Sequence, residues 1–406
     1  MLTRPRFPMS YLFAIALLSS VVTVVQAQHE AGGSSKEIMG GGIGGSTTGR
    51  TTTKTTKPPA KTTTTRKTTS TATKPPVKST ARKPATSGPN AKYYTEQGDQ
   101  YYSAKNYKDA LVSYQNAVDL DPSLANAQYR IGWIQNDLEE YEAAIPPLMQ
   151  AARLQPTAAT YFELGYSYRK LERYPEALKA YNETLRLKSD YAAAYHDIGW
   201  IYNDQKNYND AVKSLKQALQ INPNYAAAHN ELGYSLRNLG RYSEAIEEYR
   251  EAIRLDSNMG LAYLGLGDVY YYNTKQYKDA INAYKEGVRL RPNSPNALYN
   301  LAWCYNDTER YAEAVQSLRE AIRLKPDYAE AHNELGYALH QLTRYTEAIQ
   351  EYQTAIRQKS NYASAYYNLG MSYKAIGNRA LAMEQYRALQ RIDATRAQKL
   401  LTQINN

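Results

Sequence analysis

The spacing of apolar and polar residues in the segment 192–225 has the period of a helix and is interrupted once. Apolar and small side chains recur three and four positions apart in two sets: Tyr195, Ile198, Gly199 and Tyr202, and then Ala211, Leu215, Ala218 and Leu219. This spacing places each set on one face of a helix. The stretch DQKNYN between the two sets is polar and turn-like. The segment therefore predicts two amphipathic helices joined by a short turn.

The same hairpin pattern is repeated along most of the chain. A small residue returns every 33 to 35 positions, and an alanine follows in the second half of each unit. The small residues are Gly98, Gly132, Gly165, Gly199, Gly233, Gly267, Ala302, Gly336 and Gly370, and the alanines are Ala110, Ala144, Ala177, Ala211, Ala245, Ala280, Ala314, Ala348 and Ala382. One hairpin cannot bury its own apolar face, whereas stacked copies bury it against one another. The repetition predicts an elongated all-helical domain.

A period of 34 residues with these small-residue columns resembles the tetratricopeptide repeat. The resemblance implies an all-α fold, a right-handed α-solenoid or superhelix built from tandem helix-turn-helix hairpins. Nine repeats would cover residues 91–394, and the amphipathic segment 395–406 would form a C-terminal capping helix. It also implies that the first helices of successive repeats line a concave groove, where members of this family bind their partners.

The first 27 residues have the pattern of an export signal. Arg4 and Arg6 precede an apolar run over Tyr11–Val25, and small residues ending at Ala27 suit cleavage before Gln28. The run is shorter than the roughly 20 residues that span a bilayer comfortably. We therefore expect residues 1–27 to be a signal peptide and the protein to be exported to the periplasm, the cell surface or the exterior. An uncleaved membrane anchor is the alternative.

Residues 28–90 form a basic linker, first rich in glycine and then in threonine, lysine and proline. Ten Lys and Arg residues and no acid lie in the stretch 50–83. Such a composition predicts disorder, because there is little to bury. The linker is either a solvated spacer or a segment that adheres to an anionic envelope polymer. Most of the chain's net charge of +10 lies here, so the repeats are nearly neutral and a nucleic-acid partner is not expected.

Three columns of the first helices are linked, and they define a candidate binding groove. The position after the small residue holds Trp133, Tyr166, Trp200, Tyr234, Trp303 and Tyr337. Three positions later stand Asn136, Arg169, Asn203, Arg237, Asn306 and His340, and the next position holds Asp137, Asp204 and Asp307 in the tryptophan repeats. Aromatic faces, amides and guanidinium groups suit a partner's backbone and carboxylates. Pairing of Asp137 with Lys170 and of Asp204 with Arg237 between neighbouring helices is the purely structural interpretation.

The ligand that best suits such a groove is an extended segment of a partner protein, which makes the chain a non-catalytic scaffold. A carbohydrate or cell-wall polymer stacked on the aromatic column is the alternative. No motif for catalysis, a cofactor or a small-molecule substrate is present, and the histidines lack metal-ligand spacing. Cys304 occupies a column of small and apolar residues, so we interpret it as core.

Overall fold

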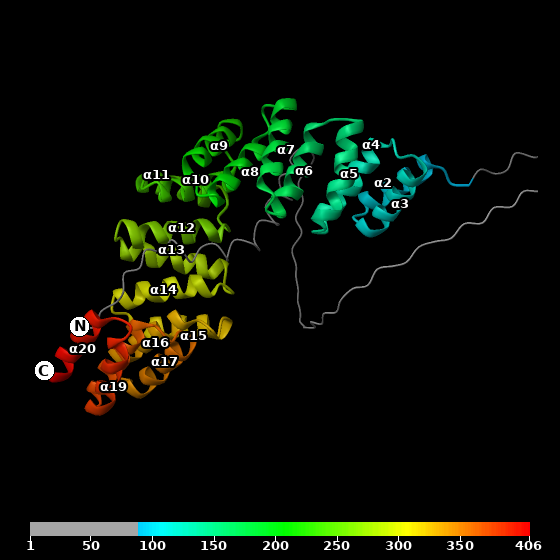
Figure 1. The fold of residues 1–406 in the computed structure, drawn as a ribbon. Helices are drawn as coiled ribbons and strands as arrows, with labels where there is room; N and C mark the ends of the chain where they lie inside the picture. Colours follow the sequence, from blue (N-terminus) through cyan, green and yellow to red (C-terminus); the bar gives the residue numbers. More distant parts are fainter. Residues whose placement is uncertain (1–87) are drawn as a thin grey trace, which may run out of the picture. The chain divides into compact units, whose positions relative to one another are not determined.

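The computed structural model describes residues 88–406, which form helical hairpins packed one on the next in chain order (Figure 1). No strand occurs among these residues. The first helices of the hairpins are α2 (Ala91–Ser103), α4 (Ala125–Asp137), α6 (Ala158–Lys170), α8 (Ala192–Asp204), α10 (Ala226–Asn238), α12 (Gly260–Asp268) with the π-helical turn η1 (Val269–Asn273), α14 (Pro295–Asp307), α16 (Ala329–Gln341) and α18 (Ala363–Ala375).

The second helices all begin nine or ten residues after the small-residue column. They are α3 (Tyr107–Leu120), α5 (Tyr141–Leu154), α7 (Tyr174–Leu187), α9 (Tyr208–Ile221), α11 (Tyr242–Leu255), α13 (Tyr277–Leu290), α15 (Tyr311–Leu324), α17 (Tyr345–Gln358) and α19 (Arg379–Gln390). A last helix, α20 (Ala394–Asn405), follows the ninth hairpin. The chain is therefore an α-solenoid of the kind that the repeat period predicts, and this fold is confirmed.

The glycine column is the place where the two helices of a hairpin touch. A Cβ on Gly165 would lie 2.7 Å from the ring of Tyr181, and one on Gly199 would lie 2.6 Å from Leu215. Real Cβ atoms do not approach this closely, so a side chain would push the helices apart. The residue facing the glycine is one of the most buried of its repeat, and Tyr181 and Leu215 are both fully buried.

Contacts between repeats place the first helices on the inner side of the array. Each second helix packs against the first helix of the next repeat, and several first helices also contact the first helix of the next repeat, as α4 does with α6 and α8 with α10. No comparable contact joins successive second helices in the described part of the chain. The first helices therefore lie closer together than the second ones, as a groove lined by first helices requires.

Repeat 6 departs from the others in its first helix. The extra residue between Tyr270 and Ala280 does not lengthen the turn between the two helices. The residue is absorbed in η1, where the helix takes a wider π turn before α13. Single π turns of this kind accommodate an insertion without breaking the helix. The buried side chains of Val269, Tyr270 and Tyr271 keep the turn packed in the core.

Helix α20 covers the end of the last hairpin. Asp393 caps its N-terminus by accepting from the Arg396 N–H at 2.9 Å, and the helix packs against α18 and α19. Ala397, Leu400 and Ile404 are its buried residues. Helix α20 thus covers the apolar face of repeat 9 that a following repeat would otherwise cover, and the other face of α20 is polar.

The proposed signal peptide, residues 1–27, and nearly all of the linker, residues 28–90, lie outside the described residues. Within residues 88–406, none of the helices combines the length and the apolar character that crossing a membrane demands.

Candidate functional site

The aromatic column forms a row of half-buried rings on the first helices. Most of these rings meet, edge to face, the tyrosine that opens the second helix of the preceding repeat. The centroids are 5.8 Å apart for Tyr107–Trp133, 6.1 Å for Tyr141–Tyr166, 6.4 Å for Tyr174–Trp200, 6.1 Å for Tyr208–Tyr234 and 6.2 Å for Tyr311–Tyr337, with interplanar angles of 69–71°. Trp303 instead contacts Tyr299 at 5.4 Å. The rings bridge neighbouring repeats and keep part of their surface exposed.

The asparagine column does not face the groove, and this part of the groove prediction is wrong. The Asn203 side chain donates to the backbone and side-chain oxygens of Glu231 at 3.1 and 3.0 Å and accepts from Ser235 at 2.6 Å. Asn136 makes the same contacts with Glu163 and Ser167 in repeat 3. Asn136 and Asn203 are 5% and 4% exposed. These amides join one repeat to the next.

Asn306 is a third member of this set. It is 2% exposed, and its Nδ2 donates to the backbone and side-chain oxygens of Glu334 at 3.3 Å. Like Asn136 and Asn203, it lies one helical turn beyond the ring, where the helix faces the next repeat. A side chain at this position is buried by stacking, which explains why it cannot reach a ligand in the groove.

The arginine column is also used between repeats. Arg169 is 3% exposed, and its Nε lies 3.4 Å from a carboxylate oxygen of Asp197 in the next repeat. Tyr181 donates to the same carboxylate at 2.8 Å. Burial alone would raise the pKa of Asp197, but the charge of Arg169 and the hydrogen bonds outweigh it and hold the pKa below its ordinary value. The pair is therefore ionised across neutral pH.

Arg237 and His340 complete the column. Arg237 pairs with Asp268 of repeat 6 at 2.5 Å, so the expected pairing of Arg237 with Asp204 is wrong. Nδ1 of His340 lies 2.8 Å from the Ser372 hydroxyl in the last repeat. Both side chains thus point toward the following repeat, as Arg169 does. Asparagine and arginine alternate at this position because each side chain has to match its hydrogen-bond or ion-pair partner in the next repeat.

A sequence signal for these contacts was present and was missed. Each of Asn136, Asn203 and Asn306 is followed after 27 or 28 residues by the glutamate that it contacts. Those glutamates, Glu163, Glu231 and Glu334, stand two positions before the glycine in the repeats that carry tyrosine. Comparison of each repeat with its successor, instead of one column at a time, would have found the pairs.

The aspartate column, unlike the asparagine column, stays at the surface. Asp204 and Asp307 are exposed and Asp137 is half-buried. Tyr174 donates to Asp204 at 2.7 Å, and Tyr271 donates to Asp307. Burial and this hydrogen bond raise the pKa of Tyr174. In repeat 4 the exposed part of the candidate site is therefore the Tyr174–Trp200 pair with the adjacent Asp204 carboxylate.

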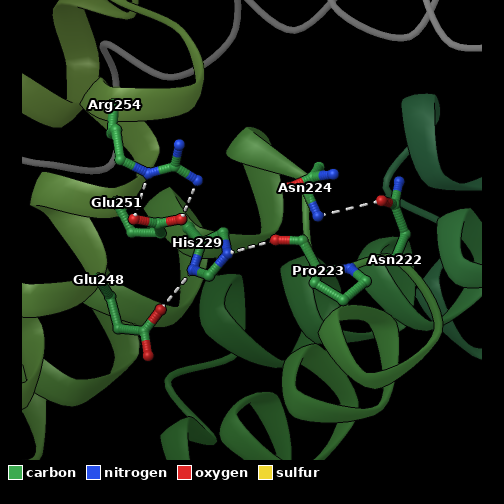
Figure 2. Close-up of polar contacts among 7 residues, drawn as sticks. All are labelled: Asn222, Pro223, Asn224, His229, Glu248, Glu251 and Arg254. Atoms are coloured by element: carbon green, nitrogen blue, oxygen red, sulfur yellow. Dashed lines mark hydrogen bonds and ion pairs between the residues drawn. The ribbon is translucent and has the colours of Figure 1, made fainter.

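The histidines of repeats 5 and 8 have a structural role at the joints between repeats. Figure 2 shows His229 with Nδ1 2.6 Å from Glu248 and Nε2 3.0 Å from the carbonyl of Pro223. His332 repeats this arrangement with Glu351 and the Pro326 carbonyl. Among residues 88–406, no three His, Cys, Asp or Glu side chains gather as a metal site would require. Cys304 is buried in the core.

An array of helical hairpins joined by polar contacts between successive repeats defines a repeat scaffold. Tetratricopeptide-repeat family models match residues 196–260, 264–329 and 307–363, residues 156–224, and residues 125–157 and 363–396, and a further TPR repeat model matches 98–136. Together they cover more than half of the chain, which therefore belongs to the tetratricopeptide-repeat family. Proteins of this family are in general non-catalytic scaffolds that bind protein or peptide partners.

Several solved structures are similar to this chain. The crystal structure of YrrB, a TPR protein described as having an unusual peptide-binding site, is 24% identical, covers 47% of this chain and 99% of its own, and has a TM-score of 0.44. MamA is 27% identical, with coverage of 41% and 97% and a TM-score of 0.39. PilF of Pseudomonas aeruginosa is 23% identical, with coverage of 52% and 97% and a TM-score of 0.46. No curated protein matches the chain.

Proposed function

We propose that this protein is a non-catalytic scaffold of the cell envelope or exterior, which binds an extended segment of a partner protein along its first helices. The observation that carries the proposal is the row of half-exposed rings at Trp133, Tyr166, Trp200, Tyr234 and Tyr337. Large rings left partly open on one side of an array are unfavourable in water unless a partner covers them. Tryptophan and tyrosine are also the side chains that most often dominate protein interfaces.

The rigidity of the row supports a partner that binds without remodelling the scaffold. Each ring is held by a tyrosine of the preceding repeat, and the amides and ion pairs one turn away fix the joint between the repeats. A preformed surface loses little conformational freedom on binding, so more of the contact energy appears as affinity. An extended segment is the shape that can contact rings on successive repeats.

A carbohydrate ligand is less well supported by the geometry. Sugar rings stack on open aromatic faces, whereas the Trp200 indole has the Arg169 guanidinium 4.8 Å from its centroid. Trp133 is packed edge-on by Tyr102 and Tyr107 at 5.3 and 5.8 Å. The parts of these rings that stay exposed are better suited to contacts with protein side chains than to stacking against a sugar ring.

Export and attachment belong to the same proposal. The export-signal pattern of residues 1–27 supports a location outside the cytoplasm. The ten basic residues of the stretch 50–83 support electrostatic attachment to an anionic envelope polymer. Secretion is checked directly by fractionating cells that express the full chain and by sequencing the N-terminus of the recovered protein. An N-terminus at Gln28 in the envelope or exterior fraction is expected, and a cytoplasmic chain starting at Met1 contradicts export.

Site-specific photo-crosslinking tests the scaffold function. A photoreactive amino acid replaces Asn238, which is exposed on the first helix of repeat 5, or Glu247, which is exposed on the second helix. The full chain is expressed in its native envelope and irradiated. One discrete adduct from position 238, absent from position 247 and identified by mass spectrometry as a protein, is the expected result. Equal labelling at both positions, or none at position 238, contradicts a partner on the first helices.

A further inference from the structure

In repeat 3 an aromatic pair of the array binds a cation from the same chain, the ammonium group of Lys170. The ammonium group of Lys170 lies 5.6 Å from the ring centroid of Tyr141 and 5.5 Å from that of Tyr166. These two rings form the standard edge-to-face pair of the array, 6.1 Å apart at 70°. A cation within about 6 Å of an aromatic face is attracted by the ring's negative potential. The rings of Tyr141 and Tyr166 thus form a cation site that is occupied by a lysine of the same chain.

Repeat 4 has the same pair, with the Arg169 guanidinium 4.8 Å from the Trp200 centroid but with no lysine at the position of Lys170. Tyr174 and Trp200 are 6.4 Å apart at the same angle of 70°, and the position equivalent to Lys170 is Asp204. The two residues of this first helix, Trp200 and Asp204, are four positions apart and therefore neighbours on its surface. The lysine of repeat 3 is thus replaced by a carboxylate of opposite charge.

Asp204 is able to accept a cation from outside. It is exposed, it forms no ion pair within residues 88–406, and its one hydrogen bond comes from Tyr174 at 2.7 Å. A carboxylate has about four acceptor sites, so this bond leaves room for an ammonium or guanidinium group. The nearby Arg169 is already paired with Asp197, which reduces its repulsion of an incoming cation.

The Trp–Asp spacing recurs in the other tryptophan repeats, although Trp303 contacts Tyr299 of its own helix in place of a tyrosine of the preceding repeat. Trp133 is followed by Asp137 and Trp303 by Asp307, at the four-residue spacing of Trp200 and Asp204. In repeats 5 and 8 the aspartate position holds Asn238 and Gln341, which carry no charge. A carboxylate at this position is therefore confined to the repeats that carry tryptophan, the better ring for a cation.

We propose that the Tyr–Trp–Asp clusters of repeats 2 and 4 each receive a lysine or arginine side chain, and that the partner is an extended protein segment carrying basic residues at intervals. This inference rests on the proposed function and specifies its partner. The ring pair attracts the cation and its aliphatic stem, and the aspartate neutralises its charge. Recognition would therefore weaken with rising salt, because Asp204 is solvent-exposed.

The test uses purified full-length protein and a fluorescein-labelled peptide of alternating lysine and serine, with a glutamate-for-lysine peptide for comparison. Fluorescence anisotropy measures the affinity. The key variant is Asp204→Lys, which installs in repeat 4 the arrangement that repeat 3 already tolerates. Glu247→Lys changes the net charge equally but lies on a second helix. Asn238→Asp adds a carboxylate beside the Tyr208–Tyr234 pair. Thermal melts verify that each variant is folded.

We expect the lysine peptide to bind and the glutamate peptide not to bind. Asp204→Lys should weaken binding of the lysine peptide by roughly tenfold, Glu247→Lys by less than about twofold, and Asn238→Asp should strengthen it about two- to threefold. Equal effects of Asp204→Lys and Glu247→Lys, or no gain from Asn238→Asp, would overturn the inference. If a protein is still crosslinked from position 238 in that case, the scaffold function stands and only the basic partner is wrong. If crosslinking fails as well, both are wrong.

Discussion

Neighbouring side chains on one turn of a first helix have different tasks in this protein. In repeat 4, Trp200 bridges to the preceding repeat through Tyr174, Asn203 is buried against Glu231 of the following repeat, and Asp204 is exposed. The buried joint residue Asn203 and Asp204, the residue that we propose binds the partner, are therefore adjacent in the chain. Substitution of one position at a time can distinguish the two roles.

The first prediction compares Asn203→Ala with Asp204→Asn. Removing the Asn203 amide takes away a donor to the Glu231 oxygens and an acceptor for the Ser235 hydroxyl at a buried joint, which costs about 1–3 kcal/mol of unfolding free energy. Asp204→Asn changes an exposed side chain and should cost less than about 0.5 kcal/mol. Urea unfolding followed by circular dichroism measures both. Similar losses in the two variants would show that Asn203 is not part of the joint.

The second prediction concerns pH and His229. Its two ring nitrogens face the acceptors Glu248 and the Pro223 carbonyl, so both bonds form only when the ring is protonated (Figure 2). Burial would lower the pKa of His229, but the Glu248 hydrogen bond and the Pro223 carbonyl outweigh it, and the pKa is raised. Glu251 also faces the ring and is itself paired with Arg254.

Because the folded-state pKa lies above the ordinary value of 6.5, the stabilisation is complete below that pH and is lost as the pH rises through the folded-state pKa. The control variant is His229→Tyr, since tyrosine fills this position in repeats 4 and 6. Thermal melts at about pH 5.5 and about pH 8.5 bracket the transition. The wild type should gain Tm relative to the variant at the lower pH. A difference that does not change with pH would show that His229 is merely packed.

At the scale of the element, each hairpin is closed by a residue in the left-handed backbone conformation. Lys206 has φ of 61°, and the helix end is completed by bonds from Lys206 N–H to Asn203 and from Asn207 N–H to Tyr202 at 3.0 and 2.8 Å. Gly240 and Gly377 occupy the same place with φ of 76°. A side chain with a Cβ is strained there, whereas glycine is not.

The third prediction follows from this turn. Lys206→Gly should stabilise the protein by up to about 1 kcal/mol because it removes the strain, and Gly240→Ala should destabilise it by a similar amount. Both positions are exposed, so packing changes little. Chemical denaturation of the two variants and the wild type gives the sign of each change in unfolding free energy. Destabilisation by Lys206→Gly would mean that the greater chain entropy of glycine in the unfolded state dominates.

The hairpins and their stacking could be predicted from the sequence, because a period of 34 residues and the small-residue columns directly encode them. The direction in which an individual side chain points could not be predicted from the sequence. Trp200 and Asn203 are both on the first helix, and whether each faces the groove or the next repeat depends on the rotation of one repeat against another. That rotation is set by contacts such as Asn203–Glu231, which a single column does not show. The rings of the aromatic column are partly exposed, Asp204 and Asp307 are exposed, and a ligand at these columns stays a prediction.

At the scale of the whole molecule, each repeat contacts its neighbours in the chain, and the two ends are protected differently. Helix α20 covers the last repeat, and its own Leu400 is fully buried against that repeat. The first repeat has no preceding hairpin within the described residues, and Tyr93 and Tyr101 are 45% and 37% exposed there. In an array of this type, stability is the sum of local terms and contacts between neighbours. A defect at one end is therefore expected to remain near that end.

The fourth prediction tests this locality. Leu400→Ala removes a buried side chain of α20 that packs against the glycine position of repeat 9, and such truncations cost about 2–5 kcal/mol. Hydrogen–deuterium exchange should show faster exchange in α18, α19 and α20 and unchanged exchange in α4 to α9. The exposed neighbour Lys399→Ala is the control. Faster exchange throughout the array would show that the repeats unfold as one cooperative unit.

Hydrogen–deuterium exchange of the full chain, with and without the partner crosslinked from position 238, tests most directly whether the ring-bearing first helices are the binding surface. The account predicts that binding slows exchange in the first helices that carry Trp133, Trp200 and Trp303, which are α4, α8 and α14. The second helices α5, α9 and α15 should exchange as before. Protection confined to the second helices, or to the turns between repeats, would contradict the account.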